Sequence, residues 1–277
     1  MSGRPHSGKV LAAIQPHSDD IPIFAAGTVA KLVDEGYTGY LFRMTNDDMA
    51  GPGSVGNTVF ENEKDNQAVA RVLGLKKVFD LNYSNHQMDQ ESTLEIRARL
   101  IFLIRLLKVD TVICYDPWGH YEENPDHYVT ARAVEAACWM AGGTKDYPEH
   151  FEAGLKPHSV AEKYYFARGP QLVNRVVDIT SHMQKKVAAN RVNLAQGPAG
   201  NQGAALRQRL AQQGMRLPVL GNDDESASNN YIEHFVLKRD ADTGRRHGLK
   251  YAEPYHYIGQ PADGMPDYIR KNAVGMR

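Results

Sequence analysis

The feature that most constrains the fold is a regular alternation of strand-like and helix-like segments through the first 170 residues. Short apolar or aromatic runs predict strands, and longer segments with helical spacing lie between them. The predicted strands are Lys9–Gln15, Tyr37–Thr45, Lys77–Asn82, Thr111–Asp116 and Lys163–Arg168, and the predicted helices are Pro22–Glu35, Glu61–Leu73, Leu94–Lys108 and Asp126–Ala141. Such alternation predicts an α/β fold: a Rossmann-like, mostly parallel sheet with helices on both faces.

Several helix boundaries carry their own signals. Pro22 suits the first turn of a helix. Gly36 and Gly74 follow the first two helices at the position where a left-handed residue ends a helix. Ser92 and Thr93 are candidate N-caps for the third helix.

The last 100 residues have a different character. Ser181–Leu194 and Ala204–Gln213 look helical, and the glycine-rich stretch Gln196–Gly203 between them predicts a flexible break. Gly221–Ser226 predicts a second surface loop. We expect one domain over residues 1–277, in which residues 1–170 form the α/β core and residues 171–277 form a smaller C-terminal lobe packed on it.

Composition narrows the classes of partner. The net charge of −1 predicts no basic face, so nucleic acid is not an expected partner. Cys114 and Cys138 lie far apart within apolar segments, which favours two buried thiols and a reducing compartment over a disulfide. The polar start, Met1–Ser7, lacks the apolar core of a signal peptide, and no apolar run is long enough to cross a bilayer. We therefore expect a soluble, cytoplasmic protein without a membrane partner.

Chemistry-bearing side chains follow the first predicted strand. The pentapeptide Pro16–Asp20 places His17, Asp19 and Asp20 on the turn at the carboxyl end of that strand. Open α/β sheets bind ligands at this edge, where neighbouring connections diverge. If the strand order is 3-2-1-4-5, the loops after the first and fourth strands share that crevice.

The loop after the fourth strand carries a second set of such residues. It runs from Asp116 to His127, and His127 lies where a helix begins. With His17 and Asp20, this histidine completes a His/Asp/His set that leaves a fourth position for water, as catalytic zinc sites do. Taken alone, each motif has a simpler interpretation, since Asp19 and Asp20 could merely cap the next helix.

At these motifs the chain resembles the PIG-L/LmbE-like family of zinc-dependent N-acetylglucosaminyl deacetylases. The family pairs an [AP]-H-P-D-D-type turn with a later H-P-D-H, which here read Pro16–Asp20 and Asn124–His127. Within the family the chain is most similar to the archaeal diacetylchitobiose deacetylases, through Asp116–His127, Gly154–Val160 and Val177–Thr180, and through Tyr251–Glu253 near the end.

The resemblance implies a role for each matching residue. His17, Asp20 and His127 would bind zinc, and Asp19 would act as the general base that takes a proton from the zinc-bound water and returns it to the leaving amine. Tyr121 matches a tyrosine that contacts the tetrahedral intermediate in related deacetylases. Asp126, in the same motif as His127, is counted among the catalytic residues.

Two positions depart from the family pattern. Asn124 stands where the family usually has histidine; its amide can donate a hydrogen bond but holds no titratable proton. Either Asp19 serves as both base and acid, or a neighbour such as His120 substitutes. Asn62 and Asp65 stand where relatives often carry an R-x-x-E pair whose arginine binds the sugar, so the substrate of this chain could differ from theirs.

The remaining predicted pocket residues come from two loops. The acidic segment after the second strand is expected to line the pocket and would suit an amino-bearing ligand, although its carboxylates could equally face solvent. Trp118 could form a pocket wall against which a sugar stacks, or simply pack in the core. The predicted substrate-binding residues are Asn46, Asp47, Met49, Asn62, Asp65, Trp118 and His120.

The sequence therefore predicts a zinc-dependent amide hydrolase that removes an acetyl group from an N-acetylated amino sugar of the N-acetylglucosamine type. Two alternatives remain: a deacylase of another small N-acyl compound, and a catalytically weak, metal-dependent binding protein. Because relatives of the diacetylchitobiose type assemble as hexamers, a homo-oligomer is also expected.

Overall fold

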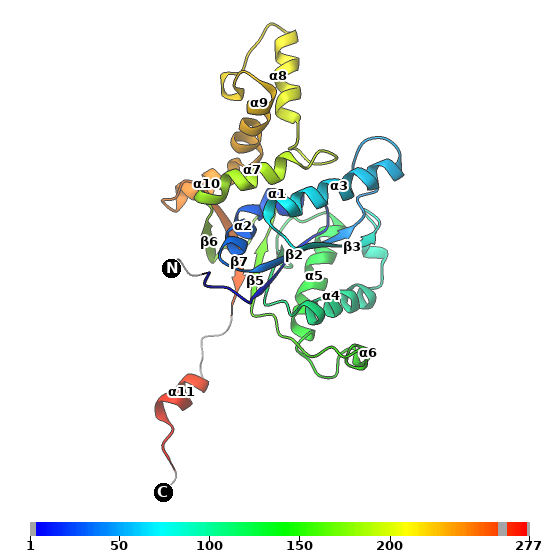
Figure 1. The fold of residues 1–277 in the computed structure, drawn as a ribbon, viewed down its shortest axis with the longest axis vertical. Helices are drawn as coiled ribbons and strands as arrows, with labels where there is room; N and C mark the ends of the chain where they lie inside the picture. The colour runs from blue at the N-terminus through cyan, green and yellow to red at the C-terminus, as the bar shows by residue number, and fades with distance from the viewer. Residues whose placement is uncertain (1–3, 260–264, 276–277) are drawn as a thin grey trace.

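A computed structural model describes residues 4–259 and 265–275 of the chain, and the strands within them form one sheet. The order across the sheet is β3-β2-β1-β4-β5-β7-β6 (Figure 1). The strands are β1 (Val10–Gln15), β2 (Thr38–Thr45), β3 (Lys77–Tyr83), β4 (Thr111–Tyr115), β5 (Glu162–Phe166), β6 (Arg175–Asp178) and β7 (Ala252–Ile258).

The first five strands run parallel, in the order 3-2-1-4-5 that the sequence analysis assumed. β1 lies between β2 and β4, with Ala13 opposite Leu41 on one side and Ile113 on the other. All three residues are fully buried because helices cover both faces of the sheet, as the apolar strand sequences predict. The carboxyl ends of β1 and β4 are therefore neighbours.

Strands β6 and β7 were not predicted from the sequence. β7 pairs antiparallel with both β5 and β6 and so extends the sheet beyond the core predicted for residues 1–170. The strand β7 contains Pro254, which sequence patterns place at sheet edges or outside strands. β6 is only 4 residues long and partly exposed, so its pattern is too short to recognise.

Helices cover both faces, as predicted. In Figure 1, α1, α2, α3 and α7 lie above the sheet, and α4, α5 and α6 lie below it. The helices are α1 (Asp20–Phe24), α2 (Ala26–Asp34), α3 (Val55–Leu73), α4 (Thr93–Leu107), α5 (Pro125–Met140), α6 (Pro148–Glu152), α7 (Met183–Arg191), α8 (Gln202–Gln212), α9 (Asp224–Tyr231), α10 (Lys238–Arg246) and α11 (Met265–Asn272).

Helix ends largely follow the sequence signals. Ser92 caps α4 by accepting a hydrogen bond from Glu95 N, and Gly74 ends α3 in a left-handed conformation, as predicted. α3 begins at Val55, six residues before the predicted start, because Ser54 caps an earlier turn that lacks apolar periodicity.

The helix predicted over Pro22–Glu35 is instead two helices. It breaks at Ala25, where α1 ends and α2 begins. The Glu253 carboxylate of β7 accepts hydrogen bonds from Gly27 N (3.0 Å) and Thr28 N (2.8 Å) in the first turn of α2. A buried carboxylate at a helix N-terminus stabilises that end of the helix, so a residue of the last strand supports the break.

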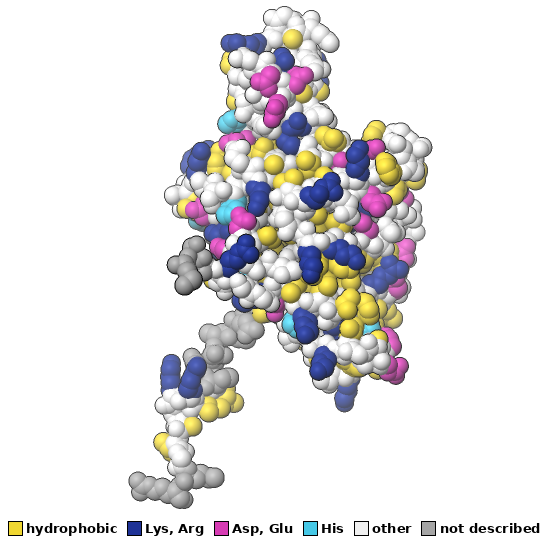
Figure 2. Space-filling model, in the orientation of Figure 1, with side chains coloured by type: hydrophobic (Ala, Val, Ile, Leu, Met, Phe, Trp, Pro, Cys, Tyr) yellow, Lys and Arg dark blue, Asp and Glu magenta, His cyan; other side chains and the backbone are white. Residues whose placement is uncertain are grey.

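The C-terminal residues form a second, smaller apolar cluster on the core. Its members include Ile179, Met183, Val187 and Ile232. Helix α7 packs against α2 and α3, whereas α8 and α9 project beyond the sheet (Figure 1). On the face shown in Figure 2, basic and acidic side chains are interspersed rather than gathered by sign. Among the helices of the described residues, none combines the length and apolarity that a bilayer crossing requires.

Candidate metal centre and active site

The turn after β1 folds back on itself so that two of its side chains face the same point. His17 N donates a hydrogen bond to Asp20 Oδ2 at 2.8 Å, and Asp20 Oδ1 accepts one from the Tyr115 hydroxyl at 2.8 Å. His17 and Asp20 are both buried. The aspartate is thus oriented by β4 as well as by its own turn.

The start of α5 brings the second histidine to the same point. Asn124 caps this helix, its Oδ1 accepting from Asp126 N at 3.0 Å, and Pro125 occupies the first turn. His127 is thereby placed in the first turn of the helix, with its ring stacked on Tyr115 at a centroid distance of 4.2 Å.

The three predicted ligands converge. His17 Nδ1 lies 3.0 Å from His127 Nε2, and the Asp20 oxygens lie 3.5 and 3.6 Å from these two nitrogens. One donor atom from each residue lies within 4.8 Å of the others. The group is buried, and its two imidazoles and one carboxylate can hold a single metal ion.

Each histidine is also held from behind by a carboxylate. His17 Nε2 lies 3.0 Å from Asp126 Oδ2, and His127 Nδ1 lies 3.0 Å from Glu122 Oε1. Metal-ligating histidines usually donate their second ring N–H to such a group, which fixes the ring and its tautomer. The residues present therefore fit a metal ion, and Glu122 is a contributor that sequence reasoning missed.

The charges of the cluster reinforce this arrangement. Burial alone would raise the pKa of Asp20, but the neighbouring His127 and His17 outweigh it and lower that pKa to about 2. Burial likewise opposes ionisation of Glu122, yet its contacts with His127 and Arg168 lower its pKa to about 2. Both carboxyl groups are thus anionic at neutral pH, as cation binding requires.

Asp19 stands beside the ligands without belonging to the cluster. Burial, followed by the nearby Asp20 carboxylate, raises the pKa of Asp19 to about 7. A carboxyl group that titrates near the working pH is suited to both accepting and returning a proton. The pKa values of the adjacent residues Asp19 and Asp20 are therefore shifted in opposite directions by their surroundings.

These residues line a cavity of about 440 Å³. It includes five of the predicted site residues, His17, Asp19, Asp20, Asn124 and His127. It also contains side chains that sequence reasoning did not select: Ile23, Phe24, Ala50, Asn85, His86, Tyr115, Arg168, Gln196 and Pro198. Four of these, Ala50, Asn85, His86 and Arg168, come from loops at the carboxyl edge of the sheet, where position could be predicted but side-chain direction could not.

Three residues predicted on the loop after β4 lie away from the cavity. Tyr121 is 86% exposed, and His120 is also exposed. Trp118 is 53% exposed and packs beside Tyr165 and His256. Trp118, His120 and Tyr121 are therefore not among the described residues that line the cavity.

The loop after β2 supports the site from outside. Asp47 is fully buried and accepts hydrogen bonds from Ser18 N (3.2 Å) and Arg43 Nη1 (3.1 Å). Asn46 accepts from Asp48 N at 3.1 Å, and Met49 is 65% exposed. Of this loop, Ala50 lines the cavity, whereas Asn46, Asp47 and Met49 do not.

Asn62 and Asp65 on α3 are committed to backbone and loop contacts. Asn62 is fully buried; its Nδ2 donates to Ala50 O at 2.7 Å and its Oδ1 accepts from Ser18 Oγ at 3.0 Å. Asp65 Oδ2 accepts from Leu194 N and Ala195 N. Both side chains thus hold loops together and neither is among the residues that line the cavity, so their contact with substrate stays a prediction.

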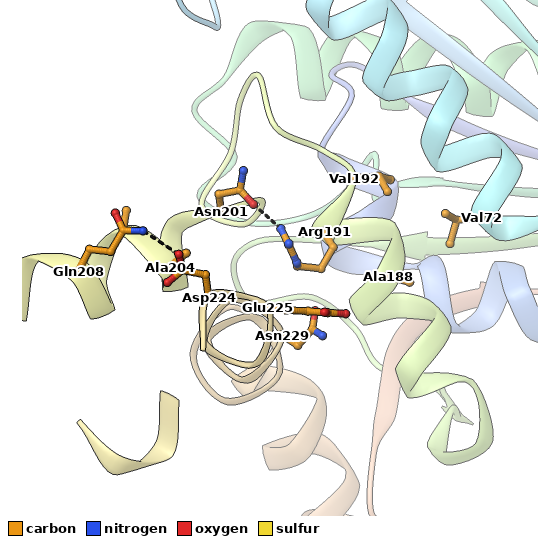
Figure 3. Close-up of a pocket in the computed structure, with 11 residues that line it drawn as sticks. Val72, Ala188, Arg191, Val192, Asn201, Ala204, Gln208, Asp224, Glu225 and Asn229 are labelled. Atoms are coloured by element: carbon orange, nitrogen blue, oxygen red, sulfur yellow. Dashed lines mark hydrogen bonds between the residues drawn. The ribbon is translucent and has the colours of Figure 1, made fainter. Parts of the chain in front are cut away.

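A larger cavity of about 750 Å³ lies elsewhere, between α7 and the α8–α9 pair (Figure 3). Its acids, Asp224 and Glu225, are exposed, and Asp224 bonds to Gln208 at 2.8 Å. The described residues of this cavity include no histidine beside the acids, so it lacks the donor set of the smaller one.

Fold and cavity together define an α/β protein whose candidate metal site lies at the carboxyl edge of a parallel sheet. The profile of the GlcNAc-PI de-N-acetylase (PIG-L) family matches residues 12–138. The chain is 31% identical over 194 residues to the diacetylchitobiose deacetylase of Thermococcus kodakarensis, covering 69% of this chain and 71% of the relative.

Two further proteins support the same assignment. The N,N'-diacetylchitobiose deacetylase of Pyrococcus horikoshii superposes with a TM-score of 0.72 and 25% identity, covering 91% of this chain and 84% of that one. A deacetylase of 1D-myo-inositol 2-acetamido-2-deoxy-alpha-D-glucopyranoside from Mycolicibacterium smegmatis is 29% identical over 52% of this chain and 51% of its own length.

The chain belongs to the PIG-L family of de-N-acetylases. This confirms the family resemblance, the α/β fold class and the deacetylase class expected from the sequence.

Proposed function

We propose that the protein is a zinc-dependent deacetylase that removes the acetyl group from N-acetylated amino sugars of the N-acetylglucosamine type. The observation that carries the proposal is the buried His17, Asp20 and His127 cluster with Asp19 beside it in one cavity. Two imidazoles and one carboxylate form the donor set of catalytic zinc sites. The named relatives act on diacetylchitobiose and on an acetamido-glucopyranoside of inositol, which supports the substrate class.

The proposed mechanism divides the work among named side chains. His17, Asp20 and His127 would hold the ion, which when bound lowers the pKa of water toward neutrality and polarises the amide carbonyl. Asp19 accepts the proton of the attacking water and returns it to the departing amine. Asp126 and Glu122 keep the two histidine rings in place and act as positioning residues.

Asn124 has a defined part despite lacking a titratable proton. Because its Oδ1 caps α5, its amide Nδ2 is the group left to donate to the developing oxyanion in the cavity. Acid catalysis must come from elsewhere. We assign the role of general acid to Asp19 or His86, because both line the cavity. His120 does not line it.

Asn85 provides a buried polar contact for substrate. Its side chain is 2% exposed and borders the cavity, and its Oδ1 accepts no hydrogen bond within the described part of the chain. An unsatisfied buried carbonyl oxygen costs free energy, which a substrate hydroxyl or N–H would relieve. This requirement suits a polyhydroxylated sugar.

One observation favours the alternative of a different N-acyl substrate. The arginine position of relatives is occupied by Asn62, which is buried and fully bonded, while Arg168 lines the mouth of the cavity beside Glu122. The guanidinium that meets the substrate therefore approaches from the loop after β5 rather than from α3.

We also propose a cytoplasmic, homo-oligomeric enzyme built as one domain over residues 1–277. Free, buried Cys114 and Cys138 support a reducing compartment. Exposed apolar residues near the projecting α8–α9 pair, including Met215 and Leu217, support a subunit contact. The sheet strands contributed by residues beyond 170 support a single domain.

The test measures zinc content by elemental analysis and amine release from a panel of N-acetylated sugars. We expect one zinc ion per chain and sugar-dependent amine release in the wild type. Asp19→Asn should keep its zinc and lose roughly 10²- to 10⁴-fold in kcat, because only the base is removed.

Asp89→Asn, a change at an exposed aspartate, serves as the matched control and should behave as wild type. Absence of bound zinc after reconstitution would overturn the site. Zinc binding without amine release from any sugar, but with release from other N-acyl amines, would favour the alternative substrate class.

A further inference from the structure

The loop between α7 and α8, residues 192–201 and here called the lobe loop, reaches from the C-terminal lobe to the cavity. Gln196 and Pro198 line the cavity that contains His17, Asp19 and His127. The sequence predicts a flexible break here because of its glycines. Its contacts instead hold it at both its base and its tip.

Arg191 closes the base of the lobe loop. Its Nη1 donates to Gly200 O at 2.8 Å and to Asn201 Oδ1 at 2.6 Å, and Gly200 N donates to Asn190 O at 3.1 Å. Figure 3 shows the contact between Arg191 and Asn201 beside the larger cavity. The two ends of the lobe loop are therefore tied to each other.

The tip of the lobe loop is tied to the core. Asp65 on α3 accepts hydrogen bonds from Leu194 N and Ala195 N at 2.5 and 2.7 Å. Gln196 Nε2 donates to Ser18 Oγ at 2.8 Å and to Asn62 Oδ1 at 2.9 Å. Because Ser18 precedes Asp19, Gln196 holds the turn that carries the candidate base.

Gly197 lies beside the candidate base, Asp19. Its φ is +79°, a left-handed conformation that favours glycine, and a Cβ atom added there would lie 2.7 Å from Asp19 Oδ2 and 3.0 Å from Asp19 Cβ. The approach is close enough that no side chain fits at residue 197 unless Asp19 moves. The backbone of Gly197 therefore limits where the Asp19 carboxyl group can lie.

We propose that the lobe loop is a positioning element of the active site, in which Gln196 and Gly197 fix the orientation of the Asp19 carboxyl group relative to the metal ligands. The proposal rests on the proposed function, since it treats Asp19 as the base. It adds that the C-terminal lobe contributes to catalysis without supplying a metal ligand.

Gly197→Ala tests the proposal. The three heavy atoms nearest to the added methyl group all belong to Asp19, so we expect Asp19 to be displaced and kcat to fall about 10²-fold, as for a misplaced catalytic group, with KM and zinc content unchanged. Gly214→Ala is the matched control. Gly214 also has positive φ (+68°), but nothing lies within 4 Å of its added Cβ, so it carries the backbone strain alone.

Gln196→Ala provides an independent variant that leaves the glycine intact. It removes the hydrogen bonds to Ser18 and Asn62 and should lower kcat with zinc content retained, whereas Gln202→Ala, at an exposed position of α8, should not. Unchanged kcat in both Gly197→Ala and Gln196→Ala, in an active enzyme, would overturn the proposal.

Crystal structures of the zinc-loaded variants separate this proposal from the assigned reaction. Displacement of Asp19 in Gly197→Ala but not in Gly214→Ala supports the positioning role, even if the enzyme deacetylates no sugar. A lack of deacetylation contradicts the proposed function instead. An Asp19 side chain that keeps its place in Gly197→Ala refutes positioning whatever substrate is found.

Discussion

At the scale of single residues, the carboxylates around His17 and His127 have different roles, which depend on the ring nitrogen that each carboxylate faces. Asp20 shares the side of the rings that can hold an ion, whereas Asp126 and Glu122 contact the opposite nitrogens. Glu122 is itself held by Arg168, which donates from Nε at 3.1 Å. The orientation of the His127 ring therefore depends on a residue at the end of β5.

Replacing Glu122 by Gln should weaken zinc binding roughly 10- to 100-fold, since the amide orients the ring of His127 less strongly and lacks the carboxylate charge. The affinity can be measured by competition with a chromogenic chelator. Glu123→Gln changes the exposed neighbour and should leave the affinity unchanged. Equal affinities for all three proteins would contradict the role assigned to Glu122.

Histidines 86 and 120 provide a second matched pair. Histidine exchanges protons near neutral pH, but only His86 lines the cavity. We expect His86→Ala to lower kcat and to alter the pH dependence of kcat, while His120→Ala leaves both unchanged. The reverse result would restore His120 as the substitute acid, and no effect of either would assign both proton transfers to Asp19.

The residues best predicted from sequence are those fixed by the backbone close to a strand end. His17, Asp20 and His127 converge because one turn follows β1 and one helix start follows β4, and both positions are readable from local pattern. The contacts of Asn62 and Asp65 could not be predicted, because α3 points these side chains at loops distant in sequence, which contain Ser18 and Leu194. Such contacts leave no local signal.

At the scale of elements, the first five strands and the helix coverage followed from hydrophobic periodicity, and their order matched the one assumed for this fold class, whereas β6 and β7 were not predicted. β7 is antiparallel to both of its neighbours, and it packs Tyr255 and Tyr257 as well as Ile258 against the core. Glu162 of β5 joins the halves of the sheet, since its carboxylate accepts from Tyr37 at 3.0 Å and from Tyr257 at 2.6 Å.

This carboxylate makes a pH-dependent contribution to stability. Although burial opposes ionisation, the hydrogen bonds from Tyr257 and Tyr37 lower the pKa of Glu162 below its ordinary 4.5. A lowered pKa stabilises the fold above pH 4.5, and that stability is lost as the pH falls through the folded-state value.

Glu162→Gln should therefore be less stable than wild type by about 1 kcal/mol at pH 7, with the difference shrinking below pH 4.5. Urea unfolding at several pH values measures both proteins under identical conditions. A difference that grows as the solution is acidified is incompatible with this account.

At the scale of the whole molecule, a buried ionic group joins the C-terminal lobe to the core. Lys186 of α7 contacts Asp240 of α10 and Glu253 of β7, each at 2.7 Å. Glu253 also accepts a hydrogen bond from Gly27 N in the first turn of α2. These three residues are buried, so each charge depends on the others for compensation. The lobe is thus coupled to the layer that supports the turn after β1.

Metal removal should lower the stability of the entire fold, because the ion would bridge the turn after β1 and the start of α5. At a free zinc concentration about 1,000 times the Kd, binding contributes about 4 kcal/mol, or roughly 10 °C in Tm for a chain of this size. A chelator should therefore reduce Tm in the wild type. Asp20→Ala should show little change on chelation, and an equal decrease in both would rule out this site as the cause.

The place of β7 in the sheet has a consequence for how the protein is made. Among the strands of the described residues, β6 pairs with β7 alone, and β7 separates it from β5, although about 70 residues of chain lie between β6 and β7. While the ribosome synthesises that interval, one edge of β5 is unpaired, and Lys186 lacks first both of its carboxylate partners and then, once Asp240 is made, still Glu253. The nascent chain therefore completes its sheet late, and this period is when chaperones have most to protect.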